Sequence, residues 1–165
     1  MFPSEFIERA AALIARYRGR GLRLATAESC TGGLVAGLLT EIPGSSAVVE
    51  RGFVVYSNDA KAELLGVPRP TLAAFGAVSQ ETARAMAQGA LAHSRADFAI
   101  AITGIAGPDG GTPEKPVGLV HFGCAGADGT LFAVEKRYGP LGRAEIRLAS
   151  VGEALDLLAR AAGGG

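Results

Sequence analysis

Apolar residues recur at helical spacing near both ends of the chain. In the first segment, one face is formed by Phe6, Ala10, Leu13 and Tyr17. In the last segment, the corresponding face is formed by Leu148, Val151, Leu155 and Leu158. Ser4 can cap the first helix and Gly19 can end it. The pattern therefore predicts helices over about residues 4–19 and 142–161.

Strand-like and helix-like patterns alternate between these two helices. Runs rich in apolar, β-branched and aromatic residues predict strands over residues 22–27, 48–56, 98–102, 117–124 and 130–138. Helical spacing and capping residues predict helices over residues 32–42, 57–65 and 79–91, with a helical turn at 71–75. A hairpin and a helix close the chain. This order favours an α/β fold, a three-layer α/β/α domain with a mixed, mostly parallel sheet.

Length and composition fit one folded domain. The 165 residues suit a single hydrophobic core, and we expect it to occupy residues 1–162, with residues 163–165 as a disordered tail. The 24 glycines are about twice the usual ~7% share. Because 48% of the residues are hydrophobic, these glycines are expected in loops and close contacts rather than in a disordered chain.

Charge and cysteine content exclude several classes of protein. The net charge of zero and the absence of a basic run argue against nucleic acid as a partner. Two cysteines, Cys30 and Cys124, are too few for a disulfide framework and lack the spacing of zinc ligands. No run of about 18 apolar residues indicates a membrane segment, and the first segment is not typical of a signal sequence. We therefore expect a soluble cytoplasmic protein without metal or cofactor.

The first concentration of chemical groups runs from Thr26 to Gly33. It joins a predicted buried strand to a helix, and ligands of open α/β sheets bind at the carboxyl ends of strands. Gly32 and Gly33 allow a ligand close to the backbone, and free amides at the helix start can hold an anion or an oxyanion. The alternative is that Ser29 or Thr31 only caps the helix.

Two candidate nucleophiles lie in this segment, Ser29 and Cys30. A thiol is the better nucleophile, but a buried cysteine is more often a small core residue. His93 lies in an alanine-rich helix and His121 inside an apolar strand, so surface and core positions are expected for them. Neither histidine is placed to act as a base.

The second concentration, from Tyr56 to Lys61, offers another base. It also joins a strand to a helix, and it shares a sheet edge with Ser29 if the two strands are parallel. The positive end of the helix dipole should lower the pKa of Lys61, which would suit a serine–lysine pair. The alternative is a solvated lysine paired with Asp59 or Glu63.

The third concentration is the glycine-rich segment from Thr103 to Pro113, which follows an apolar strand. It lacks the patterns of Walker and dinucleotide loops, but its amides can wrap a phosphate or a sugar. A flexible connection is the alternative, although long loops in small domains are usually functional. Lys115, Arg143 and Arg147 can supply positive charge for a phosphate, and a solvated position is the simpler interpretation for each.

These segments, in this order, resemble the CinA C-terminal domain family, the nicotinamide-nucleotide amidohydrolases of bacteria. The resemblance covers nearly the whole chain. The matching stretches are Thr26–Gly33 (TAESCTGG), Gly44–Ser46 (GSS), Arg51–Lys61 (RGFVVYSNDAK), Gly76–Ser79 (GAVS) and Thr103–Gly118 (TGIAGPDGGTPEKPVG).

The resemblance implies a stand-alone deamidase that converts nicotinamide mononucleotide to nicotinate mononucleotide and ammonia. It also implies a homo-oligomer, with a dimer favoured. Ser29 matches the family nucleophile, Lys61 its partner, and Tyr56 a group that relays a proton or holds the lysine. The expected substrate-binding residues are Cys30, Thr31, Gly32, Gly33, Thr103, Gly104, Gly107, Gly111 and Arg143.

Three interpretations remain open at this point. The first is a serine amidohydrolase that uses Lys61 as base. The second gives the role of nucleophile to Cys30. The third is a catalytically silent domain that senses pyridine nucleotides or binds a partner through the same pocket.

Overall fold

A computed structural model describes residues 1–163 of the chain. Its helices are α1 (Ser4–Gly19), α2 (Leu34–Thr40), α3 (Asn58–Leu65), α4 (Arg69–Phe75), α5 (Gln80–Ala92) and α6 (Arg143–Ala161), with a short 3₁₀ helix, η1, over Ser45–Ala47. Its strands are β1 (Leu24–Glu28), β2 (Val49–Val54), β3 (Phe98–Gly104), β4 (Leu119–Gly126) and β5 (Leu131–Arg137).

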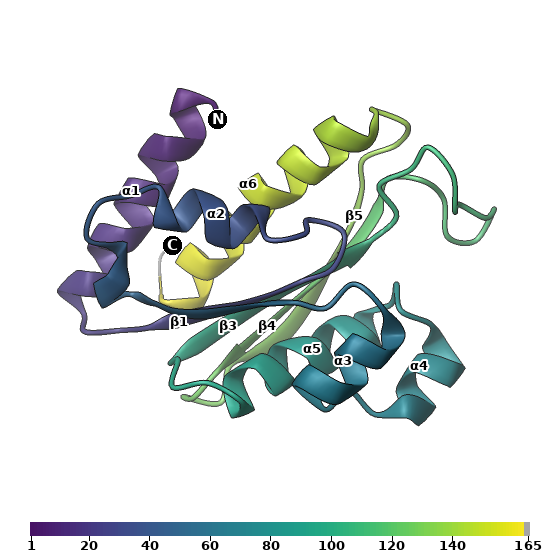
Figure 1. The fold of residues 1–165 in the computed structure, drawn as a ribbon, viewed down its shortest axis with the longest axis horizontal. Coiled ribbons are helices and arrows are strands. Elements are labelled where there is room, and N and C mark those ends of the chain that lie inside the picture. The colour runs from purple at the N-terminus through teal and green to yellow at the C-terminus, as the bar shows by residue number, and fades with distance from the viewer. Residues whose placement is uncertain (164–165) are drawn as a thin grey trace.

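The five strands form one mixed sheet in the order β2-β1-β3-β4-β5. Strands β2, β1 and β3 run parallel, whereas β4 and β5 add an antiparallel hairpin. Helices α1, α2 and α6 cover one face and α3, α4 and α5 the other (Figure 1). The predicted three-layer α/β/α fold is therefore confirmed.

The two faces of the sheet carry side chains of different size. Toward α1, α2 and α6 the strands present large residues, among them Leu24, Ile100, Ile102, Val120 and Phe122. Toward α3 and α5 they present alanines, namely Ala25, Ala27, Ala99, Ala101 and Ala125. Small residues let helices approach a sheet closely, so α5 lies directly against β4, where a Cβ at Gly123 would collide with the Ala83 carbonyl.

A second close approach joins α5 to α3. A Cβ at Gly89 in α5 would collide with the carbonyl oxygen of Leu65, the last residue of α3. Helix α3 carries Lys61, so this contact fixes the height of the lysine above the sheet. Part of the glycine surplus thus serves backbone packing.

The local predictions are largely correct, with two corrections. Ser57 caps α3 and Ser79 caps α5, each accepting a hydrogen bond from an amide three residues later. Ser4, however, is the first residue of α1 and provides no cap. The predicted helix over 32–42 begins only at Leu34, because Gly32 and Gly33 have φ of 58° and 98° and form a turn.

The part of the chain that the structure describes ends in a turn at Gly163, whose amide donates to the Arg160 carbonyl. The last two residues of the predicted tail, 164 and 165, lie outside the described residues. Within residues 1–163, every helix is too short or too polar to cross a membrane.

Candidate active site

Ser29 follows directly after β1 and continues its ladder. Its amide donates to the carbonyl of Ile102 in β3, at 2.9 Å. Side chains alternate between the faces of a strand, so Glu28 points toward α2 and Ser29 toward α3. The hydroxyl of Ser29 is thereby directed at the helix that carries Lys61.

Lys61 lies in the middle of α3 and is 1% exposed. Its Nζ donates to the carbonyls of Val55 and Tyr56, at 2.9 and 3.2 Å, and lies 3.1 Å from Ser29 Oγ. The parallel pairing of β1 with β2 brings the two groups to the same sheet edge, as predicted. The solvated alternative for Lys61 is wrong. Asp59 pairs instead with Arg69, at 2.8 Å.

Burial is the main cause that lowers the pKa of Lys61, and the electrostatic effect of Cys30 acts in the opposite direction. The predicted direction of the pKa shift is therefore correct, but its main cause is burial and not the helix dipole that the sequence indicated. No carboxylate within residues 1–163 forms an ion pair with the amine.

The partners of Lys61 determine what its neutral form can do. Carbonyl oxygens only accept, so those of Val55 and Tyr56 take two N–H groups of the amine. The third position faces the Ser29 hydroxyl. In neutral Lys61 that position is a lone pair, which can accept the Ser29 proton.

Cys30 adjoins the serine but is poorly suited to be the nucleophile. It is 6% exposed, and burial raises its pKa to about 12. A thiol with such a pKa stays protonated near neutrality, whereas the thiolate is the reactive form. This observation favours Ser29.

The turn between β1 and α2 contains both occupied and free amides. The amides of Val35 and Ala36, at the helix start, donate to Glu28, so the expected ligand position there is filled by the protein itself. The Gly32 amide donates to the Ser29 carbonyl, at 3.1 Å. The amides without an acceptor among residues 1–163 are those of Cys30, Thr31 and Gly33.

A pocket of about 220 Å³ opens at the serine–lysine pair. Its lining residues are Ser29, Cys30, Tyr56, Lys61, Ala77, Val78, Thr103, Gly104, Ala106 and Arg143. Seven of these belong to the predicted site. The other three were not predicted as site residues: Ala77 and Val78, which lie in the GAVS stretch, and Ala106, which lies within the glycine-rich segment.

Five predicted binding residues lie outside this lining. Thr31 is fully buried, and Gly32 and Gly33 form the backbone of the turn. The Gly107 carbonyl accepts a hydrogen bond from Arg143, at 2.8 Å. Gly111 packs against the backbone of the loop near residue 117. None of these five residues lines the pocket directly.

Arg143 and Tyr56 meet at the pocket mouth. The Arg143 guanidinium donates to the Tyr56 hydroxyl, at 3.2 Å, and it comes from the first residue of α6. Tyr56 is 63% exposed and holds Lys61 through its backbone carbonyl, not through its phenol. Inside the pocket, Thr103 Oγ1 donates to the Ala77 carbonyl, at 2.8 Å.

The remaining charged candidates have structural contacts. Arg147 donates to the carbonyls of Cys30 and Thr31, at 3.1 and 3.3 Å, and Lys115 donates to the Phe75 carbonyl. His93 is exposed and His121 is buried in β4, as predicted. In the described part of the chain, His, Cys, Asp and Glu side chains form no group of three that could hold a metal ion.

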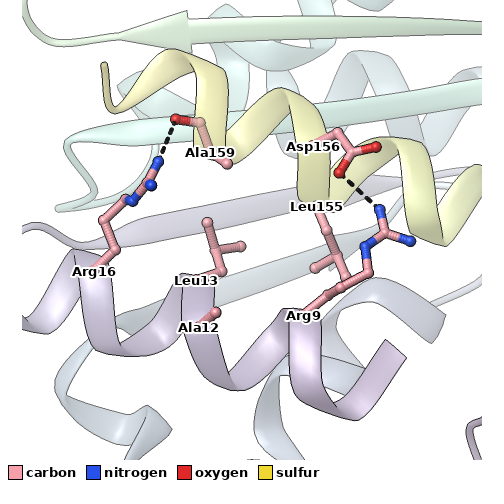
Figure 2. A pocket seen from close by; sticks show the side chains of 7 residues that line it. All are labelled: Arg9, Ala12, Leu13, Arg16, Leu155, Asp156 and Ala159. Atoms are coloured by element: carbon pink, nitrogen blue, oxygen red, sulfur yellow. Dashed lines mark hydrogen bonds and ion pairs between the residues drawn. The ribbon is translucent and has the colours of Figure 1, made fainter. Parts of the chain in front are cut away.

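A second hollow, of about 180 Å³, lies between α1 and α6 (Figure 2). Ion pairing of Arg9 with Asp156, at 2.7 Å, spans one end, and Arg16 reaches the Ala159 carbonyl at the other. Its remaining lining residues are Ala12, Leu13 and Leu155. It offers no hydroxyl or thiol, and its Asp156 carboxylate is paired with Arg9. The pocket with the serine–lysine pair is therefore the candidate active site.

Comparison with known proteins gives one consistent result. The family model described as CinA C-terminal domain matches residues 7–162. A CinA-like protein of Anaeromyxobacter sp. (strain Fw109-5) is 55% identical over 148 residues, which are 90% of this chain and 36% of that protein. Another, of Mycolicibacterium gilvum, is 56% identical over 145 residues, which are 88% of this chain and 34% of that protein. The chain thus spans about a third of the length of these relatives.

Solved structures agree in fold. The competence/damage inducible protein CihA from Agrobacterium tumefaciens has a TM-score of 0.96 and 57% identity, with 97% of each chain covered. A CinA superfamily protein from Klebsiella pneumoniae has a TM-score of 0.90 and 34% identity, covering 96% of this chain and 98% of its own.

Proposed function

The chain belongs to the CinA C-terminal domain family, and we propose that it hydrolyses the carboxamide of nicotinamide mononucleotide to nicotinate mononucleotide and ammonia. The observation that carries the proposal is the 3.1 Å contact between Lys61 Nζ and Ser29 Oγ in a pocket. A buried lysine with a lowered pKa beside a serine is the arrangement of a nucleophile and its general base. The substrate follows from the family resemblance.

In the first step, neutral Lys61 accepts the proton of the Ser29 hydroxyl. Ser29 Oγ then attacks the carboxamide carbon, and the carbonyl π electrons move to the oxygen. The carbonyls of Val55 and Tyr56 hold the resulting ammonium by its other N–H groups. The base therefore keeps its position in both protonation states.

The negative oxygen of the tetrahedral intermediate needs hydrogen-bond donors. Among the unpartnered amides of the turn, that of Cys30 is the candidate, because Cys30 lines the pocket and Thr31 and Gly33 do not. A well-placed donor of this kind contributes about 3–4 kcal/mol in comparable sites.

In the second half of the reaction, Lys61 returns its proton to the departing nitrogen and ammonia leaves. Water, deprotonated by the same amine, then attacks the acyl-enzyme. The Ser29–carbonyl bond breaks, the Lys61 ammonium returns its proton to Ser29 Oγ, and the acid product is released and ionises to nicotinate. Arg143, at the pocket mouth, supplies a positive charge for the phosphate of the nucleotide. Thr103 and Gly104, at the end of the neighbouring strand β3, also line the pocket.

The test is a discontinuous ammonia assay against nicotinamide mononucleotide and related pyridine amides, with chromatographic detection of the acid product. Wild-type protein should release ammonia and Ser29→Ala should not. Wild-type protein that binds the nucleotide, measured by calorimetry, but never releases ammonia would show a sensing domain. Turnover that persists in Ser29→Ala but is lost in Cys30→Ala would assign the nucleophile to Cys30.

A further inference from the structure

Glu28 is a buried carboxylate beside the nucleophile, and the proposed mechanism leaves it without a role. It is fully buried. One oxygen accepts from the Val35 amide, at 2.9 Å. The other accepts from the Ala36 amide, at 3.0 Å, and from the Thr26 hydroxyl, at 3.3 Å. Burial of a carboxylate is costly unless its oxygens are hydrogen-bonded, so this placement requires a structural or functional reason.

The position of Glu28 follows from strand alternation. Thr26 and Glu28 lie on the same face of β1, toward α2, and Ser29 lies on the opposite face. Helix α2 has Gly33 at its N-cap and therefore no side chain of its own to cap it. Glu28 supplies that cap from the preceding strand. Its hydrogen bonds join the end of β1 to the start of α2, on either side of the turn, and Ser29 is the first residue of that turn.

The same turn is held from its other side by Arg147. The guanidinium of Arg147 binds the carbonyls of Cys30 and Thr31. In a planar trans peptide the N–H points opposite to the C=O, so fixing the Cys30 carbonyl also fixes the direction of the Thr31 amide. The backbone also joins the turn to α2, because the Leu34 and Gly37 amides donate to the Thr31 and Gly33 carbonyls. Glu28 adds a side-chain link between the end of β1 and the first amides of α2.

We propose that Glu28 is a positioning residue for catalysis, which fixes the Ser29–Gly33 turn so that the hydroxyl meets Lys61 and the free amides keep their direction. This inference rests on the proposed role of Ser29 as nucleophile. It does not require that the substrate be nicotinamide mononucleotide.

The test compares wild-type protein with Glu28→Gln. Glutamine has nearly the same shape, but its NH₂ group would face an amide N–H, and the negative charge at the helix start is lost. Two rates are measured across a pH series. The first is ammonia release from nicotinamide mononucleotide, split into kcat and KM. The second is labelling of Ser29 by a fluorophosphonate, in which the Oγ–phosphorus bond forms, fluoride leaves and the proton passes to Lys61.

We expect kcat and the labelling rate of Glu28→Gln to fall about 10- to 100-fold, which is the usual effect of a small misplacement of reacting groups. KM should change less than about twofold, and the midpoint of the pH profile should not move, because Lys61 keeps its surroundings. Tyr17→Phe is the matched control. It removes one buried hydrogen bond, to the Leu158 carbonyl at 2.8 Å, near Phe98 at the opposite end of the sheet. It should lower the melting temperature without changing either rate.

The outcomes are distinguishable. Slower labelling of Glu28→Gln supports the proposal even if wild-type protein releases no ammonia, in which case only the proposed substrate is wrong. Labelling at the wild-type rate overturns the proposal. Wild-type protein that is not labelled at Ser29 overturns it as well, because no activated hydroxyl would be present to position. If Glu28→Gln does not fold, Thr26→Val, which removes one donor to the carboxylate, provides the test with an expected two- to threefold decrease, about what one weak hydrogen bond contributes.

Discussion

Replacing Lys61 with methionine removes the proposed general base while keeping an unbranched side chain of similar length in the same cavity. The Ser29 hydroxyl then has no amine to accept its proton, because Lys61 Nζ is the proposed acceptor. General bases contribute about 10²–10⁴-fold to rate, which corresponds to about 3–5 kcal/mol at 1.36 kcal/mol per tenfold. We expect kcat for ammonia release to fall by this factor.

The effect on stability can be derived from the same contacts. The carbonyls of Val55 and Tyr56 lose their donor. Val55 is fully buried, so its unpaired carbonyl costs about 1–3 kcal/mol. Tyr56 is largely exposed, and water can replace the lost bond there. The gain from no longer burying an amine opposes this cost, so Lys61→Met should fold, with a change in unfolding free energy of at most about 3 kcal/mol.

The assay is ammonia release by Lys61→Met, Ser29→Ala and the double variant, with unfolding measured in urea. Residues that act as one unit give non-additive losses, so the double variant should be no slower than the slower single variant. Losses that multiply, or a Lys61→Met variant that keeps more than about a tenth of wild-type kcat, well above the loss expected of a general base, would refute the pairing.

The pH dependence follows from the lowered pKa of Lys61. The reaction uses the neutral amine, so the rate should rise with pH through the lowered pKa and then level off. The unfolded chain binds this proton more tightly than the folded protein, since its lysine titrates near the ordinary 10.5. The free energy of unfolding should therefore rise with pH between the lowered pKa and 10.5 and level off above it. Lys61→Met should lack this rise in a series of urea titrations.

Three further variants test other parts of the site and the fold. Cys30→Ala should keep turnover and lose about 1 kcal/mol of stability, measured by ammonia assay and urea unfolding; loss of turnover in a folded protein would return the thiol to consideration. Arg143→Ala should raise KM for nicotinamide mononucleotide about 10- to 100-fold through the lost charged contact, with kcat nearly unchanged; an unchanged KM would place the phosphate elsewhere. Gly89→Ala should destabilise the protein by about 1–3 kcal/mol or more in urea, because its Cβ meets the Leu65 carbonyl. Gly19→Ala in α1, with open space around the new methyl group, is its control and should be as stable as wild-type protein or up to about 1 kcal/mol more stable.

The local pattern was enough to predict most of the fold. Apolar spacing located the helices and strands, and hydroxyl residues marked two helix starts, at Ser57 and Ser79. The error at residues 32–42 has a local cause. Gly32 and Gly33 look like part of an apolar helix, but their positive φ values form the turn that carries the candidate chemistry.

The sequence by itself determined which residue types stand at the ends of two strands, and so the candidates Ser29 and Lys61. Tertiary structure alone decided between the alternatives for the lysine. Whether its amine is solvated or buried depends on the register of β1 against β2 and on the approach of α3 to α5. Neither can be read from the residues next to Lys61 in the sequence.

Tertiary structure also decided which anion occupies the start of α2 and which candidate residues line the pocket. Glu28 reaches amides seven and eight residues later because β1 and α2 pack against each other. Arg143 arrives at Tyr56 from a helix 87 residues further along the chain. Contacts between residues so far apart in sequence follow from the packing of whole elements, so local pattern determines the chemical groups and the fold determines which of them meet.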